Sequence, residues 1–223
     1  MERFMYRAQL KRGYEDLLKD RTSLCAASLK KLVGEGALMT LTIFILENQL
    51  YLYYECCSDE IKPHEMLPDL DSILEDWPGV ADFTGSGVCG GFRKWVRMTD
   101  IFDSSTPYDA GHWKRKQPVA RRVGKLGFLK PEKVAAYVYY HYQLQTGSNA
   151  TDNKYCTIAI NENVLFYYDE EPHIEDRHPE KEAKGMAVPI ENWQQFMDTH
   201  FFLWEGDHEG DRKFKPMEHI LSI

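Results

Sequence analysis

One β-hairpin pattern occurs twice in the chain, and this duplication constrains the fold more than any other feature of the sequence. The two copies read LENQLYLYYE, from Leu46 to Glu55, and INENVLFYYDE, from Ile160 to Glu170. In each copy, β-rich runs flank a short polar link, which is the pattern of a hairpin. Because the copies can be laid over each other at a constant offset, they predict an internal duplication into two units of about one hundred residues each.

The segments that flank the hairpins follow the same order in both halves of the chain. In the first half, apolar spacing and turn residues predict a strand, two helices and a closing strand over residues 3–10, 14–33, 91–102 and 112–118. In the second half they predict the same elements over residues 119–129, 131–145, 191–204 and 214–223. With its hairpin, each half therefore reads βαββαβ.

This repeated order predicts the class α+β, built from two tandem ferredoxin-like βαββαβ units over residues 1–118 and 119–223. The open face of each four-stranded sheet has to be buried. We therefore expect the two sheets to cover each other and to form an intramolecular α+β barrel. Insertions over residues 58–89 and 169–185 interrupt the units, and the second is charged enough to form a solvated loop.

Charge and hydropathy narrow the classes of partner. The chain has 223 residues, with 27 Lys and Arg against 35 Asp and Glu, a net charge of −8, and it has no Lys/Arg-rich run. Nucleic acid is therefore not expected as a partner, and a neutral or cationic small molecule or a protein is favoured. The absence of a long apolar run or an apolar leader predicts no membrane segment, and five cysteines without a C-x-x-C pair predict reduced thiols in the cytoplasm.

The segment KPEKVAAYVYYHYQ, over residues 130–143, holds the most distinctive side chains. On a helix, Val134, Tyr137, Val138 and His141 share one face. That face should pack toward the sheet or the barrel interior, so His141 is predicted to be buried. A buried imidazole needs partners for both ring nitrogens, and Tyr137 can reach it or a shared ligand from one turn away.

The ordered series RFMYRAQLKRGYEDLLKDR, a helix with Tyr-x-x-x-His, a hairpin and KWVRMTDIF resembles the L-rhamnose mutarotase family. Its members are small dimeric α+β-barrel proteins that interconvert sugar anomers. The resemblance covers most of the chain twice, outside the insertions. It implies that His141 is the acid/base residue and that Tyr137 assists it. It also implies substrate-binding roles at the start of the second strand, on the second helices and on the last strand, for Tyr155, Trp193, Trp95 and Glu218.

The first unit departs from the family pattern at its polar site positions. Leu18 and Thr22 stand where the helical tyrosine and histidine are expected, and Leu41 stands where the strand tyrosine is expected. We interpret this unit as one retained for structure. The hypothesis is one site per chain, in the second unit, and the protein is expected to be a monomer or a homodimer.

Mutarotation requires one proton to leave the anomeric hydroxyl and another to reach the ring oxygen, which histidine can mediate. Tyrosine hydroxyls suit sugar hydroxyls, and an indole suits the C–H face of a sugar ring. The function implied is an isomerase that acts on L-rhamnose or a related sugar, with no metal and no cofactor. Two alternatives remain open: a non-catalytic carbohydrate-binding or structural barrel, and another barrel enzyme such as a cofactor-free monooxygenase or a lyase.

Each candidate residue also has a purely structural interpretation. In that interpretation, His141, Tyr155 and Trp193 pack the core without contacting a substrate, and Glu218 faces solvent. The glycines of Gly85–Gly90 match G-x-G-x-x-G, but no βαβ unit surrounds them, so a dinucleotide site is not expected. His173 and His178 lie in an acidic loop whose spacing fits no zinc motif.

Overall fold

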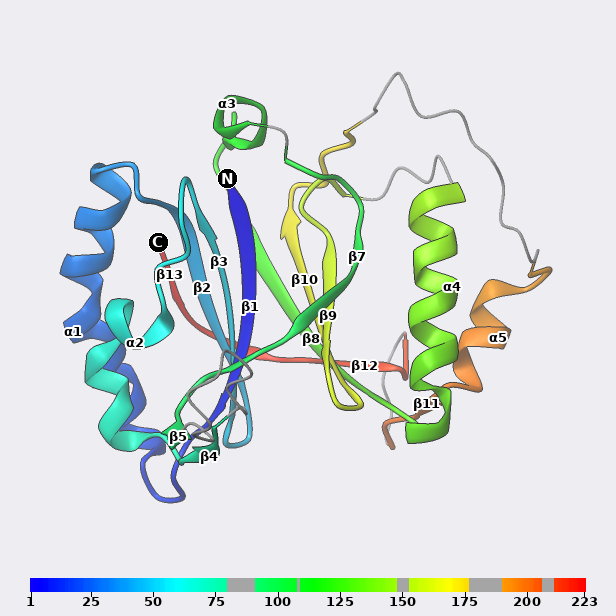
Figure 1. Ribbon diagram of the computed structural model, residues 1–223, viewed down its shortest axis with the longest axis horizontal. Coiled ribbons are helices and arrows are strands. Elements are labelled where there is room, and N and C mark those ends of the chain that lie inside the picture. The colour runs from blue at the N-terminus through cyan, green and yellow to red at the C-terminus, as the bar shows by residue number, and fades with distance from the viewer. Residues whose placement is uncertain (80–90, 108, 148–152, 177–189, 206–210) are drawn as a thin grey trace, which may run out of the picture. The chain divides into compact units, whose positions relative to one another are not determined.

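The computed structural model describes residues 1–79, 91–107, 109–147, 153–176, 190–205 and 211–223 (Figure 1). It has mixed α+β architecture with antiparallel sheets. The chain forms two compact units: unit 1 contains Met1–Met98 and His219–Ile223, and unit 2 contains Thr99–Glu218. These bounds differ from the boundary of the sequence repeats at residue 118. The strand over residues 99–103, from the first repeat, pairs in the sheet of unit 2, and the strand over residues 218–222, from the second repeat, pairs in the sheet of unit 1.

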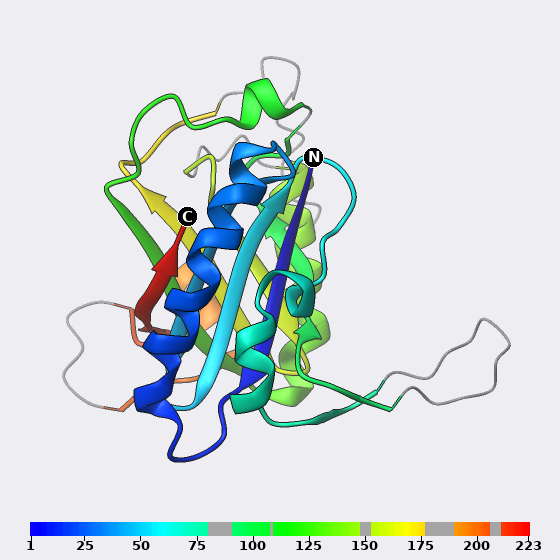
Figure 2. The same cartoon turned by 90° about the vertical axis from the view of Figure 1, so that its left-hand side faces the viewer.

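Unit 1 is built on a five-stranded sheet with the order β13-β2-β3-β1-β6. Its strands are β1 (Glu2–Gln9), β2 (Leu38–Leu46), β3 (Gln49–Cys56), β6 (Val96–Arg97) and β13 (Glu218–Ser222). The remaining elements are α1 (Glu15–Gly34), α2 (Pro63–Met66), the 3₁₀ helix η1 (Pro68–Ile73) and the small ribbon of β4 (Trp77–Pro78) with β5 (Phe92–Arg93). Figure 2 shows α1 lying along one face of the sheet.

The core of unit 1 lies between α1 and this sheet. Acidic residues in the first turn of α1 and Lys31 in its last turn suit the helix dipole. Leu18, Cys25 and Leu29 are almost fully buried on one side of the helix, at helical spacing. They belong to one apolar cluster with the sheet residues Leu41, Ile43, Leu50 and Leu52. The predicted helix over 14–33 is confirmed, and so is the hairpin that follows it.

The C-terminal strand β13 closes the outer edge of β2. Leu41 and Ile223 exchange two backbone hydrogen bonds, of 3.3 and 3.0 Å, and Thr40 Oγ1 donates to the carbonyl oxygen of Ile223 at 2.7 Å. Residues 1–98 therefore need the last residues of the chain to complete their sheet.

Unit 2 has a sheet with the order β11-β8-β10-β9-β7, and β12 also pairs with β8. Its strands are β7 (Thr99–Asp103), β8 (Arg121–Leu129), β9 (Thr157–Asn161), β10 (Val164–Glu171), β11 (Phe201–Phe202) and β12 (Phe214–Pro216). Its helices are α3 (Ala110–Trp113), η2 (Pro131–Lys133), α4 (Val134–Gly147) and α5 (Trp193–Asp198). In Figure 1, α4 and α5 lie beside each other, and their side chains share an apolar cluster with Leu129, Ile158 and Leu165 of the sheet.

The two hairpins have the same local structure, which confirms the repeated pattern. Their turns place Glu47 and Glu162 in the left-handed region, with φ of 56° and 57°. Two residues before the end of each matched pattern, a tyrosine hydroxyl donates to the final glutamate: Tyr53 to Glu55 at 2.5 Å, and Tyr168 to Glu170 at 2.6 Å. Glu47 thus corresponds to Glu162, and Glu55 to Glu170.

The helix predicted over residues 91–102 is wrong, because this segment forms β5, β6 and β7. Val96 and Met98 are buried while Arg97 and Thr99 are exposed, which is the alternation of a half-buried strand. Over so short an apolar run, helical and strand patterns resemble each other, and backbone pairing of β6 with β1 and of β7 with β9 decides the structure.

The strand predicted over residues 112–118 is also wrong. Residues Ala110–Trp113 form the short helix α3, and the side chain of its N-cap, Asp109, accepts a hydrogen bond from the backbone nitrogen of His112 at 2.6 Å. An aspartate at this position satisfies an otherwise unpaired N–H of the first turn, which favours helix over strand.

Two predicted elements near the C-terminus are shorter than expected. Of the helix predicted over 191–204, only Trp193–Asp198 is helical, and Phe201–Phe202 forms β11. The strand predicted over 214–223 divides into β12 and β13, which belong to different sheets.

Candidate functional site

A pocket of about 280 Å³ lies in unit 2, where residues of α4 and α5 face those of the sheet. Tyr137, His141 and Trp193, which the sequence singled out, all line it. Phe102 of β7 and Phe201 of β11 contribute apolar walls. The volume lies near the lower end for small-molecule sites, which suits a ligand the size of one sugar ring.

Helix α4 places His141 at the pocket wall. Pro131 begins the preceding 3₁₀ turn, where its missing N–H costs little, and α4 continues from there. Tyr137 and His141 lie one turn apart, and their ring centroids are 3.9 Å apart with an interplanar angle of 31°. Only 6% of His141 and 2% of Tyr137 is exposed, so the predicted burial is confirmed.

The hydrogen bond at one nitrogen of His141 defines the chemistry of the other. Nδ1 lies 2.9 Å from the carbonyl oxygen of Tyr137. A carbonyl can only accept, so Nδ1 carries the proton and the neutral ring leaves a lone pair on Nε2. Among the residues described, no side chain or backbone group hydrogen-bonds to this Nε2. Nε2 is therefore available to accept a proton or a hydrogen bond from a ligand.

The pKa of His141 is lowered to about 4, chiefly by burial; the bond to the Tyr137 carbonyl opposes the shift, and the nearby imidazole of His200 adds to it. Desolvation dominates because a charged imidazolium loses water that the apolar surroundings do not replace. At neutral pH the ring is therefore uncharged.

Aromatic rings hold His141 from three sides. Besides Tyr137, the edge or face of Trp193 lies at a centroid distance of 5.4 Å and an angle of 63°, and that of Phe102 at 5.9 Å and 84°. Trp193 is the first residue of α5, and the Asn192 side chain caps this helix by accepting from Gln195 N at 3.0 Å. The cap fixes the start of α5 and with it the position of the indole.

Polar side chains that the sequence reasoning missed complete the pocket. Tyr167 OH donates to Asp169 Oδ2 at 2.8 Å, and burial raises the pKa of both Tyr137 and Tyr167, so both phenols stay protonated. Lys125 and Lys213 also line the pocket. Strand alternation could have placed Lys125 and Tyr167 on the helix-covered face, because Tyr167 pairs with Lys125 and lies beside Ile158.

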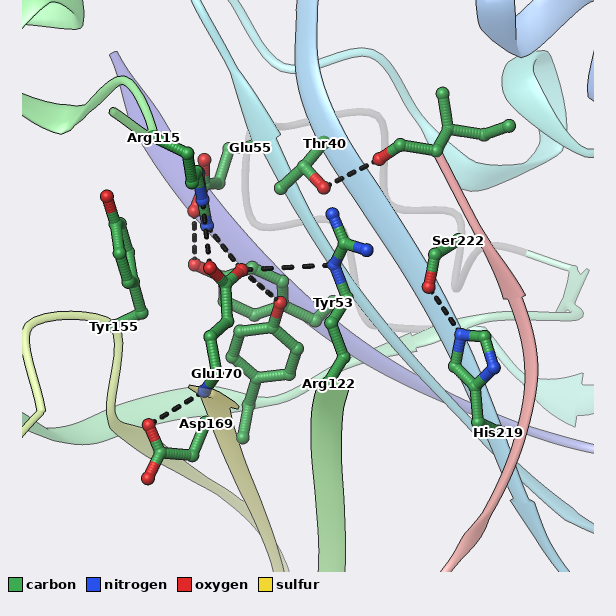
Figure 3. Close-up of polar contacts among 12 residues, drawn as sticks. Thr40, Tyr53, Glu55, Arg115, Arg122, Tyr155, Asp169, Glu170, His219 and Ser222 are labelled. Carbon is green, nitrogen blue, oxygen red and sulfur yellow. Dashed lines mark hydrogen bonds and ion pairs between the residues drawn. The ribbon is translucent and has the colours of Figure 1, made fainter. Parts of the chain in front are cut away.

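Tyr155 does not line this pocket. Its hydroxyl donates to the carbonyl oxygen of Trp113 at 3.1 Å, and the guanidinium of Arg115 lies 4.1 Å from its ring centroid. Tyr155 thus belongs to a second, buried polar cluster of unit 2. Figure 3 shows this cluster, in which Arg115 holds Glu170 through two nitrogens at 2.7 and 3.0 Å and Arg122 approaches it at 3.9 Å.

The other two candidate residues also lie outside this pocket. Trp95 precedes β6 and lines a separate hollow of unit 1, and Glu218 is exposed at the start of β13. The prediction that Trp95 lies on a helix is wrong, whereas Trp193 does begin one.

The first unit repeats the helix geometry of the site without its chemistry. Thr22 Oγ1 donates to the carbonyl oxygen of Leu18 at 2.9 Å, as His141 Nδ1 does to that of Tyr137. Leu18, Thr22 and Leu41 are all nearly fully buried. A hydroxyl committed to its own helix and two leucines offer no acid/base group at this position.

No group of three or more His, Cys, Asp or Glu side chains that could hold a metal ion occurs in the described part of the chain. Gly85–Gly90 and His178 lie outside the described residues. Of the helices that the structure describes, none combines the length and the apolar composition required to cross a bilayer.

Comparison with known proteins adds little to this geometry. No family model matches the chain, and no curated protein matches it. Among solved structures, one match is a protein of Fusobacterium nucleatum subsp. nucleatum named "Putative monooxygenase". The two are 13% identical, the match covers 74% of each chain, and the TM-score is 0.36. A likeness at this level carries no argument about fold or activity.

Proposed function

We propose that unit 2 carries a mutarotase-like site that interconverts the anomers of a reducing sugar, L-rhamnose or a relative. One observation carries this proposal: His141 lines a pocket of about 280 Å³ with a lone pair on Nε2 that no described group occupies. Beside it lie the phenol of Tyr137 and the indole of Trp193. Such walls suit a sugar ring, whose hydroxyls meet donors and whose C–H face meets an aromatic surface.

In this mechanism Nε2 of His141 takes the proton of the anomeric hydroxyl. The neutral phenol of Tyr137 gives a proton to the ring oxygen as the bond between C1 and that oxygen breaks. The open-chain carbonyl then rotates, and the reverse transfers close the ring and restore both groups. Because the pKa of His141 is about 4, its protonated form is a strong acid and returns the proton readily.

The finer description of the fold is part of the same proposal. The strand order β2-β3-β1 in one sheet and β9-β10-β8 in the other, each with its own long helix, supports two ferredoxin-like units in tandem. Closure of the two sheets into one barrel stays a prediction. A cytoplasmic location, and a monomer or homodimer, stay predictions as well.

A second candidate function is sugar binding without catalysis, and the pKa of His141 favours it. A general base is most effective when its pKa lies near the operating pH, and a value of about 4 makes His141 a weak base at pH 7. The first unit, with Thr22 and Leu18 at the matching positions, supports this alternative because it has no base there.

Saturation-transfer NMR on a panel of reducing sugars, including L-rhamnose, L-fucose and uronic acids, tests the proposal. Exchange should be accelerated by the wild type, lost in His141→Ala, and unchanged in Thr22→Val, the matched change in unit 1. Binding without acceleration would select the carbohydrate-binding alternative. Full activity of a folded His141→Ala variant would refute the assignment of His141 as the base.

A further inference from the structure

Two lysines, Lys125 and Lys213, line the candidate pocket, and their ammonium groups have different partners. Lys125 lies in the middle of β8, paired with Tyr167 of β10, and both side chains line the pocket. Its ammonium lies 5.2 Å from the ring centroid of Tyr167, and the side chain is half-buried. The charge is thus held at the pocket wall over an aromatic face.

The other pocket lysine is fully committed. Lys213 Nζ contacts Asp198 Oδ1 at 2.8 Å, Asp211 Oδ1 at 3.0 Å and Gln194 Oε1 at 2.9 Å. These carboxylates raise the pKa of Lys213. Its positive charge is therefore neutralised by the protein, and it offers little to a ligand.

In the part of the chain that the structure describes, Lys125 has no such counter-ion. Within the described ranges of the chain, no carboxylate lies within ion-pairing distance of its ammonium. The acidic residues on the neighbouring strand have other partners. Asp169 accepts hydrogen bonds from Tyr167 and Asn153. Glu171 pairs with Arg121 and interacts with Lys125 only at longer range. A partly desolvated ammonium without a partner is costly, and an anionic ligand would remove that cost.

We propose that Lys125 binds a carboxylate of the substrate, so that the site takes an acidic sugar of the uronic type in preference to a neutral one. The inference rests on the proposed function and narrows its substrate class. The lining carries two lysines against the single carboxylate of Asp211, while His141 is neutral at pH 7. Because Lys213 and Asp211 pair with each other, Lys125 carries the charge of this lining that is left for a ligand, although the whole chain carries −8 and long-range attraction would favour neutral or cationic molecules.

The test compares D-galacturonate with D-galactose, and D-glucuronate with D-glucose, which differ at one exocyclic carbon. Affinity is measured by calorimetry and by NMR titration for the wild type, Lys125→Met and Lys215→Met. Lys215 is the matched control, because its ammonium also lies over an aromatic ring, 4.8 Å from the Trp204 centroid, and it does not line the pocket.

We expect the wild type to bind each uronate at least about tenfold more tightly than the matching aldose, and Lys125→Met to lose about tenfold for the uronate alone. Lys125→Arg should retain the preference. Lys125→Gln replaces the methionine variant if that variant does not fold. Equal affinity for acid and aldose, or an equal loss of both on removal of the charge, would overturn the inference.

Binding and catalysis are read separately, so the two proposals fail in different ways. Uronate binding that depends on Lys125, without acceleration of anomer exchange, supports this inference and refutes mutarotation. Accelerated exchange of neutral sugars that ignores Lys125 supports mutarotation and overturns the acidic substrate.

Discussion

The Nδ1 of His141 donates to the carbonyl oxygen of Tyr137, one helical turn before it, at 2.9 Å. This bond fixes the tautomer, and burial keeps the ring neutral, so the pocket contains a base whose lone pair lies on Nε2. The bond to Tyr137 therefore determines the tautomer, and burial determines the charge of the ring.

The pH dependence of anomer exchange should reveal this base. Because the pKa of His141 is about 4, kcat/KM should be nearly constant from pH 5 to 8 and fall about tenfold per pH unit below 4. Saturation-transfer NMR over pH 3.5–8, with checks that the protein stays folded, measures the profile. A midpoint near 6.5 would mean that the imidazole is solvated in the working enzyme.

Acid should also destabilise the fold through His141. The folded pKa of about 4 lies below the ordinary 6.5, so the unfolded chain binds the extra proton between these values. Stability is therefore full above pH 6.5 and is lost as the pH falls toward 4, by up to about 3 kcal/mol. Urea unfolding at pH 7 and pH 5 should show a smaller acid loss for His141→Gln than for the wild type.

In His141→Gln, the free energy of unfolding should still fall somewhat as the pH falls, because burial also lowers the pKa of His200. Substitution of the exposed His64 by Gln is the control for loss of a histidine at the surface. An identical pH slope in the wild type and His141→Gln would contradict the prediction.

A side chain at Gly127 should close part of the pocket wall. A Cβ there would lie 3.0 Å from ring carbons of Phe201 and Phe214 and 3.1 Å from the carbonyl oxygen of Lys213. We expect Gly127→Ala to lower the free energy of unfolding by about 1–3 kcal/mol and to weaken ligand binding. Gly34→Ala is the control, since a Cβ there meets nothing within 4 Å. Unchanged stability of Gly127→Ala would show that the two rings move aside freely.

Two adjacent glutamates of β10 should contribute very differently to the free energy of unfolding. Glu170 is 2% exposed and is held by Arg115, whereas the neighbouring Glu171 pairs with Arg121 at the surface. Glu170→Gln removes a buried carboxylate charge that the Arg115 guanidinium pairs with and should cost about 3 kcal/mol. Glu171→Gln should have little effect, because water screens an exposed pair. Chemical denaturation of both variants measures the difference, and equal effects would refute it.

The features of the fold that were predictable are those set by local pattern. The helical spacing of Leu18, Cys25 and Leu29 predicted α1, and the β-rich runs around a short polar link predicted both hairpins. The register of these elements then follows from which face is apolar. His141 and Tyr137 were predictable for the same reason, since one helix places both on its buried face.

The features of the fold and the site that were not predicted depend on contacts between segments that are distant in the sequence. The run GFRKWVRMTDIF has an apolar spacing that suits a helix or a strand, and only its pairing with β1 and β9 settles the matter. Lys125 was missed because a lysine on a strand is usually solvated, and its place beside Tyr167 depends on the β8–β10 register. Tyr155 was assigned to the site on a family pattern, while its environment is set by α3, which was expected to be a strand.

The pairing of β13 with β2 has a consequence for folding during translation. Residues 1–98 are translated first, yet the outer edge of β2 waits for residues 218–223 to emerge from the exit tunnel. Until then the nascent chain presents an open strand edge, the kind of surface that invites pairing with other chains. The sheet of unit 1 is therefore completed only after unit 2 has been synthesised.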